Sequence, residues 1–274
     1  MNNSDRYVVV GNPIQQSKSP IIHREFADQC KQDIQYGKIE FALGSFAVEA
    51  RAFFDSGGKG MNITAPFKED AYNFADSLSE RAQAARAVNT LALMSDGNIV
   101  GDNTDGTGLV NDIVDRLHWP LTEQRILILG AGGAVRGILL PLLNSGVTEI
   151  VIANRTLEKA KSLSTHFSPF GSVTAIGFEQ LADTASFDLI INGTSASLTG
   201  KGIDIPLAIL KENTAFYDLV YSDEATPFMR DAAARGYKNI ADGLGMLVGQ
   251  AAESFRVWRG VMPDIDGVYS LLRP

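Results

Sequence analysis

The feature that most constrains the fold is an apolar segment, residues 125–129, that runs directly into a cluster of glycines. The segment reads Arg-Ile-Leu-Ile-Leu and is followed by Gly-Ala-Gly-Gly-Ala at 130–134. Residues 133–145 then carry apolar side chains at helical spacing, and a second β-rich run follows at 149–154. A strand, a glycine turn, a helix and a strand in this order predict a βαβ unit, which implies a parallel sheet.

The alternation of strand-like and helical segments continues after this unit. Further strand-like runs lie at 173–176, 188–192 and 215–219. Repeated β–α alternation is typical of a doubly wound parallel sheet with crossover helices. We therefore expect a Rossmann-like domain over residues 106–242.

The first hundred residues predict a second α/β domain, because they mix strands and helices without the phosphate-loop glycine spacing. A long helical pattern at 243–260 is expected to return to this domain. The chain is thus predicted to form two domains with a cleft between them: residues 1–105, completed by 243–274, and residues 106–242. In the first domain we expect strands at 7–10, 35–43, 59–64, 88–94 and 98–101, and helices at 21–30 (with Ser19 as N-cap), at 47–54 and from about 68.

Composition excludes several classes of function. A net charge of -8 over 274 residues opposes a large nucleic-acid footprint. No apolar run approaches the roughly 18 residues of a membrane span, and the N-terminus shows no signal-peptide pattern, so we expect a cytoplasmic protein without a membrane partner. Cys30 is the only cysteine, which excludes an internal disulfide.

Two further sets of polar residues show no catalytic pattern. The three histidines lack metal-ligand spacing, so no metal site is expected: His23, His118 and His166. Three carboxylates are interpreted as a solvated helix face with its following loop: Asp112, Asp115 and Glu123.

The glycine cluster is a candidate site for a dinucleotide. Gly130 permits a tight turn, and Gly132 lets the backbone approach a pyrophosphate at the positive end of a helix. The whole loop is assigned to cofactor binding: Gly130, Ala131, Gly132, Gly133 and Ala134. The third position of the fingerprint is Val135 in place of Gly or Ala, so helix–strand packing must differ there. The alternative is a merely structural glycine turn.

The end of the next strand favours NADP over NAD as the dinucleotide. An NAD-binding protein offers Asp or Glu there, whereas this chain has Asn154, Arg155 and Thr156, with Lys159 one helical turn on. A guanidinium pairs bidentately with a 2′-phosphate. The alternative is that Arg155 and Lys159 are solvated residues at a helix start.

Lys68 and Asp105 are the candidate catalytic pair of the first domain. Both lie at strand-to-helix transitions. Oxidation of an alcohol needs a group that accepts the hydroxyl proton, and a lysine held by a carboxylate can do this. Capping preferences alone favour the alternative, in which Lys68 is an exposed lysine at a helix start and Asp105 is an N-cap.

Several separated motifs, in matching order, resemble the shikimate dehydrogenase family across nearly the whole chain. In the first domain these are Gly11-Asn12-Pro13, Ser17-Lys18-Ser19-Pro20, residues 62–68 (Asn-Ile-Thr-Ala-Pro-Phe-Lys), Ala87-Val88-Asn89-Thr90 and residues 101–106 (Gly-Asp-Asn-Thr-Asp-Gly). The similarity continues through residues 130–134, 154–156, 192–195 and 243–250.

This resemblance implies reversible reduction of 3-dehydroshikimate to shikimate by NADPH, in the pathway to chorismate and the aromatic amino acids. It implies that Lys68 is the acid/base and Asp105 its partner. The implied substrate-binding residues are Ser17, Ser19, Thr64, Asn89, Tyr221 and Gln250. The resemblance adds Glu80, Leu219 and Gly243 as cofactor contacts, although Glu80 is equally interpreted as a helix-surface carboxylate.

Three other functions stay open on the sequence. They are a dehydrogenase that also accepts quinate, a methylenetetrahydrofolate dehydrogenase, and a non-catalytic NADP-binding sensor. Arg155 opposes an NAD-preferring enzyme, Ser17 and Ser19 oppose the folate enzyme by resemblance, and the retained Lys68 and Asp105 oppose the sensor. The sequence is compatible with a monomer or a homodimer.

Overall fold

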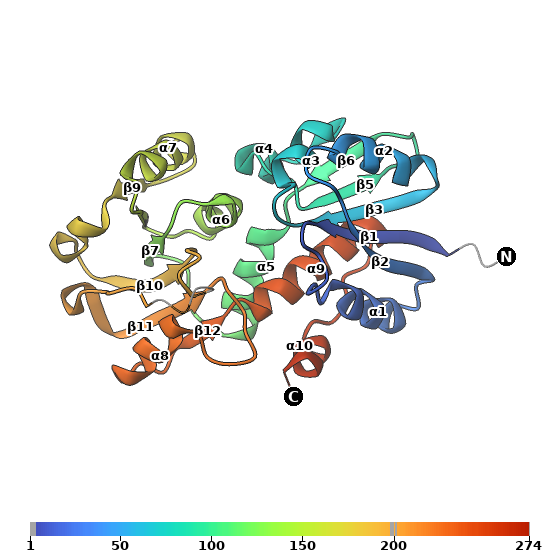
Figure 1. The fold of residues 1–274 in the computed structure, drawn as a ribbon. Helices are drawn as coiled ribbons and strands as arrows, with labels where there is room; N and C mark the ends of the chain where they lie inside the picture. The colour runs from blue at the N-terminus through green and yellow to red at the C-terminus, as the bar shows by residue number, and fades with distance from the viewer. Residues whose placement is uncertain (1–3, 198–199, 201, 274) are drawn as a thin grey trace. The chain divides into compact units, whose positions relative to one another are not determined.

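The computed structural model describes residues 4–197, 200 and 202–273 (Figure 1). Its contacts divide the chain into two compact units. The first unit runs to Gly108 and resumes at Leu247, and the second unit is Leu109–Met246. The two boundaries fall inside helices α5 (Asp105–Asn111) and α9 (Leu244–Arg259).

The first unit is built on a six-stranded mixed sheet with the order β2-β1-β3-β5-β6-β4. β1 pairs in parallel with β2 and β3, whereas β5 is antiparallel to both β3 and β6, and β4 is parallel to β6. The strands are β1 (Asp5–Gly11), β2 (Ile34–Glu40), β3 (Gly58–Ile63), β4 (Ser77–Leu78), β5 (Thr90–Leu93) and β6 (Ile99–Asp102). The further helices of this unit are α1 (Ser19–Cys30), α2 (Phe46–Asp55), α3 (Lys68–Phe74), α4 (Glu80–Ala85) and α10 (Asp266–Leu272).

Helices cover both faces of this sheet (Figure 1). Successive side chains of β1 point to opposite faces. Val8 and Val10 join the core formed with α2, α3 and α4, whereas Tyr7 packs on Trp258 of α9 with ring centroids 4.7 Å apart. A separate apolar cluster joins α1, α9 and α10, and its largest buried side chains are Phe26 and Phe255.

The second unit is built on a six-stranded sheet in which every pairing is parallel. Its order, β12-β11-β10-β7-β8-β9, is the 3-2-1-4-5-6 order of a Rossmann fold read from the other edge. The strands are β7 (Arg125–Leu129), β8 (Glu149–Ala153), β9 (Val173–Ile176), β10 (Phe187–Asn192), β11 (Leu210–Asp218) and β12 (Ile240–Asp242). This confirms the expected doubly wound α/β sheet.

The connections of the second unit are mostly helical. They include α6 (Gly133–Asn144), α7 (Leu157–Phe167), α8 (Pro227–Ala234), the 3-10 helices η2 (Phe178–Asp183) and η4 (Leu207–Ile209), and the π-helix η1 (Asp112–Arg116). The central strands are almost wholly buried, as apolar runs such as Ile126–Leu129 require in a sheet covered on both faces. Across the described residues, we find no helix that is both long and apolar enough to cross a bilayer.

Candidate active site

Lys68 and Asp105 form an ion pair in the first unit. Lys68 begins α3 and Asp105 begins α5, and the Lys68 Nζ atom lies 2.5 Å from Asp105 Oδ2. The lysine side chain is 25% exposed and the aspartate side chain 8%. The pair therefore combines a largely buried carboxylate with an ammonium that still reaches solvent, which is the accessibility that proton exchange with a bound molecule requires.

Asn89 and Gln250 join this pair. The Asn89 carboxamide donates a hydrogen bond to Asp105 Oδ1 at 2.8 Å, and its Nδ2 atom lies 3.2 Å from Gln250 Oε1. Asn89 directly precedes β5, and Gln250 lies on α9. Four of the predicted site residues are thus joined by direct polar contacts, although they lie up to 182 residues apart in the sequence, from Lys68 to Gln250.

Ser17 and Ser19 lie together at the beginning of α1. The Ser17 hydroxyl donates to Ser19 Oγ at 3.2 Å, and the Ser19 amide donates to Ser17 Oγ at 3.3 Å. The expectation that Ser19 is the N-cap was wrong: Lys18 takes that position, and Ser19 is the first helical residue. The helix begins two residues earlier than expected and has Pro20 in its first turn, where the missing N–H costs no helical hydrogen bond.

Thr64 follows β3 and is half buried. Its methyl group occupies the space beside Gly11, where an added Cβ would lie 2.5 Å from Thr64 Cγ2. Gly11 ends the neighbouring strand β1, so the absence of a side chain there lets Thr64 sit at the carboxyl ends of the parallel strands. Ligands of open α/β sheets bind at this edge.

Beneath the pair lies a buried polar layer that the sequence analysis missed. Its members are Asn62, Thr90, Thr104 and Ser254, which are at most 5% exposed. They hydrogen-bond with one another and with Asn89. A signal was present: Asn62 interrupts an apolar strand, and Ser254 lies four residues after Gln250, on the same face of a helix.

A second missed feature is a charge cluster around Arg81. Its guanidinium contacts Asp102 at 2.6 Å and Glu253 at 2.8 Å. Burial opposes the charge of Arg81, but its two carboxylate partners outweigh that effect and raise its pKa. Burial likewise raises the pKa of Asp102, yet Arg81 and Ser79 hold it below its usual value. The cluster anchors the strand end that leads into Asp105.

In the second unit, the glycine loop lies where the strand order reverses, between β7 and β10. Gly130 has a φ of 103°, which only glycine adopts readily, and added Cβ atoms at Gly132 and Gly133 would meet nothing within 4 Å. The N-cap of α6, Gly132, has no side-chain cap. Open backbone at the positive end of a 12-residue helix suits a pyrophosphate.

Val135, the departure from the fingerprint, is accommodated by another glycine. It is fully buried, and an added Cβ at Gly193 would collide with Val135 Cγ2. Gly193 directly follows β10. The close packing that a glycine on the helix normally provides is supplied here by a glycine on the facing strand end.

Asn154, Arg155 and Thr156 follow β8, as expected. Asn154 donates to the Thr156 carbonyl oxygen at 2.8 Å, which closes the turn before α7. Arg155 and Lys159 are exposed, and within the described part of the chain Arg155 forms no hydrogen bond or ion pair. An exposed guanidinium at this strand end is available for an anionic ligand.

The remaining predicted residues are distributed over both units. Leu219 and Gly243 lie against each other in the second unit, where an added Cβ at Gly243 would collide with the Leu219 carbonyl oxygen. Tyr221 is half buried, and burial together with Asp223 raises its pKa. Glu80 is an exposed residue at the first turn of α4, and no hydrogen bond or ion pair among the described residues joins it to another predicted site residue.

One interpretation of the carboxylates was wrong. Asp112 is not solvated but fully buried, and it accepts a hydrogen bond from the Tyr217 hydroxyl at 2.7 Å and pairs with Arg116 at 2.5 Å. Residues 112–116 form a π-helix, and Asp112 is one of its buried residues. Asp115 and Glu123 are exposed.

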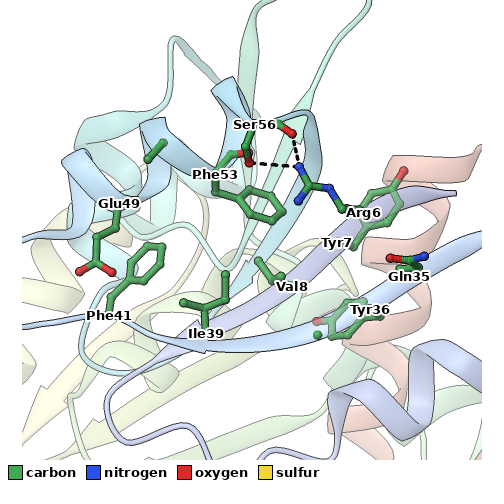
Figure 2. Close-up of a pocket in the computed structure, with 12 residues that line it drawn as sticks. Arg6, Tyr7, Val8, Gln35, Tyr36, Ile39, Phe41, Glu49, Phe53 and Ser56 are labelled. Carbon is green, nitrogen blue, oxygen red and sulfur yellow. Dashed lines mark hydrogen bonds between the residues drawn. The ribbon is translucent and has the colours of Figure 1, made fainter. Parts of the chain in front are cut away.

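The structure also bears on a metal site and on a pocket outside the predicted site. Among the described residues, no group of three or more His, Cys, Asp or Glu side chains could hold a metal ion. A pocket of about 640 Å³ lies beside β1, β2 and α2 (Figure 2). Its wall includes Val8, Ile39 and Phe41, and the Arg6 guanidinium bonds to Ser56 at its rim. It contains none of the predicted site residues.

A Rossmann sheet with an open glycine loop and a separate unit carrying a lysine–aspartate pair define the class of protein: an α/β oxidoreductase of the dehydrogenase type. Comparison with known proteins makes this specific. "Shikimate dehydrogenase substrate binding domain" matches residues 9–91, "Shikimate / quinate 5-dehydrogenase" residues 111–200, and "Shikimate 5'-dehydrogenase C-terminal domain" residues 243–273.

The similarity extends over the full length. A protein of Saccharophagus degradans named shikimate dehydrogenase (NADP(+)) is 53% identical, over 98% of this chain and 99% of its own. An Ael1 enzyme from Pseudomonas putida has a TM-score of 0.92 at 48% identity, covering 99% of both chains. The Thermus thermophilus shikimate 5-dehydrogenase, solved with NADP(H) and shikimate, has a TM-score of 0.85 at 31% identity, covering 98% of both. The chain belongs to the shikimate dehydrogenase family.

Proposed function

We propose that this chain reduces 3-dehydroshikimate to shikimate with NADPH, reversibly, in the pathway that leads to the aromatic amino acids. The observation that carries the proposal is the Lys68–Asp105 ion pair with Asn89 and Gln250 bonded around it. The substrate is inferred from the membership of this chain in the shikimate dehydrogenase family. The first unit is the substrate domain and the second the cofactor domain.

The proton of the reaction is handled by Lys68. In the direction of reduction, bound NADPH supplies a hydride to the carbonyl carbon of the substrate. The Lys68 ammonium gives a proton to the carbonyl oxygen, and in the reverse direction the neutral amine takes that proton back. Asp105 holds the lysine through one carboxylate oxygen, while Asn89 holds the other oxygen. Because Asn89 stops the Asp105 carboxylate from rotating, the carboxylate holds Lys68 in one position.

The polar groups around the pair suit a ring that carries several hydroxyls and a carboxylate. Ser17 and Ser19 offer hydroxyl donors at the positive end of α1, where a carboxylate is favoured. Thr64, Asn89 and Gln250 offer the donors and acceptors for the ring hydroxyls, and Tyr221 is assigned to the same ligand by family resemblance. A site that pairs each hydroxyl rejects analogues that lack one.

The second unit has residues that fit NADP. The open backbone of Gly132 and Gly133 leaves room for the pyrophosphate, and the exposed Arg155 fits the 2′-phosphate together with Asn154, Thr156 and Lys159. Leu219 and Gly243 are assigned to the nicotinamide end. Glu80 is assigned to the cofactor by family resemblance.

The assay uses the purified full chain with NADP and either shikimate or quinate, and follows the absorbance of the reduced nicotinamide. We expect turnover with shikimate and NADP, and much weaker turnover with NAD. Absence of turnover with shikimate, despite measurable NADP binding, would favour the sensor and refute the proposed reaction. Comparable kcat/KM for shikimate and quinate would assign the broader dehydrogenase.

A further inference from the structure

Directly beneath Asn89 lie two hydroxyl groups that no solvent reaches. Thr90 begins β5 and Ser254 lies on α9, and both residues are fully buried. Because neither side chain is accessible, neither can contact a bound substrate. Their hydroxyls nevertheless connect to the catalytic pair through Asn89.

The Asn89 carboxamide must face one way for Asp105 to be held. Its Nδ2 atom donates to Asp105 Oδ1 at 2.8 Å. Its Oδ1 atom accepts from the Thr104 amide and from the Thr90 hydroxyl, both at 2.9 Å. A flipped amide would place Oδ1 against the carboxylate and leave both donors without an acceptor, so these two donors determine which end of the amide meets Asp105.

The Thr90 proton is itself directed by its neighbours. A hydroxyl has a single proton, and Asn89 Oδ1 can only accept, so Thr90 donates to Asn89. Ser254 Oγ lies 2.7 Å from Thr90 Oγ1, and its hydroxyl also donates to the Gln250 carbonyl oxygen at 2.9 Å. Asn62 donates to Ser254 Oγ at 2.9 Å. Asn62 also donates to Thr90 Oγ1 at 3.3 Å, so Thr90 accepts from Asn62 and gives its own proton to Asn89.

The orientation of the Asn62 carboxamide is also fixed. Asn62 Oδ1 accepts from the Tyr36 hydroxyl at 2.7 Å and lies 3.1 Å from His23 Nε2. Two donors on the oxygen leave the nitrogen of Asn62 facing Ser254. A donor to Thr90 polarises its hydroxyl, which strengthens the hydrogen bond that Thr90 gives to Asn89.

We propose that Thr90 is a positioning residue for the Lys68–Asp105 pair, with Ser254 as its support. The proposal rests on the proposed function. Thr90 holds the Asn89 amide so that it donates to Asp105, which keeps the other carboxylate oxygen of Asp105 on Lys68. Without the Thr90 hydroxyl, Asn89 Oδ1 keeps only the Thr104 amide at 2.9 Å and the longer contact from the Thr104 hydroxyl at 3.2 Å, so the carboxamide samples orientations in which Asp105 is released.

The test compares Thr90→Val, which has the same shape but no hydroxyl, with Thr90→Ser, which keeps it. The control is Thr214→Val in the second unit. Thr214 is also buried, and its hydroxyl accepts from the Lys211 amide and donates to the Phe187 carbonyl oxygen, both at 2.8 Å. Each kcat is divided by the number of shikimate-binding sites found by calorimetry, so that unfolded protein does not count.

We expect Thr90→Val to lower kcat per site about 10-fold, the effect of one lost hydrogen bond to a catalytic group. The KM for NADP should stay within about 3-fold of wild type, and Thr90→Ser should restore most of the activity. Thr214→Val should keep the wild-type kcat per site. Ser254→Ala, which removes the support and leaves the Thr90 hydroxyl in place, should lower kcat per site by a smaller factor of about 3.

A Thr90→Val variant with wild-type kcat per site would overturn this proposal while leaving the proposed function intact. So would a Thr90→Ser variant as impaired as Thr90→Val, because the hydroxyl would then not be the cause. If Thr90→Val does not fold, Ser254→Ala becomes the test, and an unchanged kcat per site in that variant would overturn the proposal. A wild-type chain that does not turn over shikimate would remove both proposals.

Discussion

Replacing Lys68 with alanine tests the proposed acid/base directly. We expect kcat to fall at least about 100-fold, which corresponds to about 2.7 kcal/mol in the activation free energy. The KM for shikimate should change little, because the lysine acts on a proton that moves only in the transition state. The assay is oxidation of shikimate with NADP, run at saturating cofactor.

The structure allows the catalytic loss to be separated from a loss of stability. After the change, Asp105 still accepts from Asn89 at 2.8 Å, so the polar cluster keeps most of its bonds. Because the Lys68 side chain is one-quarter exposed, solvent already screens the ion pair, and its removal should cost about 1 kcal/mol of unfolding free energy. That is a shift of roughly 2–4 °C in Tm.

Lys211→Ala provides the matched control. Lys211 also lies 2.5 Å from a carboxylate, Asp188 Oδ1, but in the second unit and on a 45% exposed side chain. Lys211→Ala should lower Tm by no more than Lys68→Ala does, and it should leave kcat unchanged. The reasoning would be refuted by a Lys68→Ala enzyme whose kcat stays within about 10-fold of wild type.

Three further changes test other parts of the structure. Arg155→Ala should raise the KM for NADPH at least about 10-fold and leave the KM for NADH unchanged, because only NADPH carries the 2′-phosphate; equal effects on both would contradict this. Gly193→Ala should lower the unfolding free energy by about 1–3 kcal/mol through its collision with Val135, and adding Val135→Ala should recover part of that loss in urea titrations. Burial lowers the pKa of His23 from 6.5 to about 3, so its neutral form contributes stability that is complete above pH 6.5 and declines as the pH falls toward about 3. His23→Gln should flatten that decline, by at most about 1.4 kcal/mol per pH unit, and an unchanged slope would rule this out.

The fold was largely predictable because its strongest signals are local. The run of Ile126, Leu127, Ile128 and Leu129 into a glycine turn specifies a buried parallel strand and a phosphate-type loop without information from elsewhere in the chain. The strand ends were mostly correct to within a few residues. The hairpin of β5 and β6 was predicted from the turn signal at residues 95–97 and is confirmed, whereas the antiparallel pairing of β5 with β3 was not predicted, since pairing between distant strands leaves no local pattern.

Asp112 shows why some polar residues were misread. Its sequence neighbours, Asp115 and Arg116, are those of an exposed helix face. The partner that explains its burial, Tyr217, lies 105 residues away on β11. A buried carboxylate with a distant partner cannot be distinguished from a solvated one by spacing alone.

The polar layer under Asn89 was also missed because its members are distant from one another in the sequence. Asn62, Thr90 and Ser254 lie between the sheet and α9, where apolar side chains of similar volume would stabilise the unit as well or better. Among the described residues, only His23 Nδ1 is a buried side-chain polar atom without a partner, so the layer is almost completely satisfied. A satisfied polar layer adds little net stability but fixes orientation, because an amide that is turned round loses its hydrogen-bond partners. These residues therefore serve to orient Asn89 and Asp105. Measurements of stability alone would not detect that role.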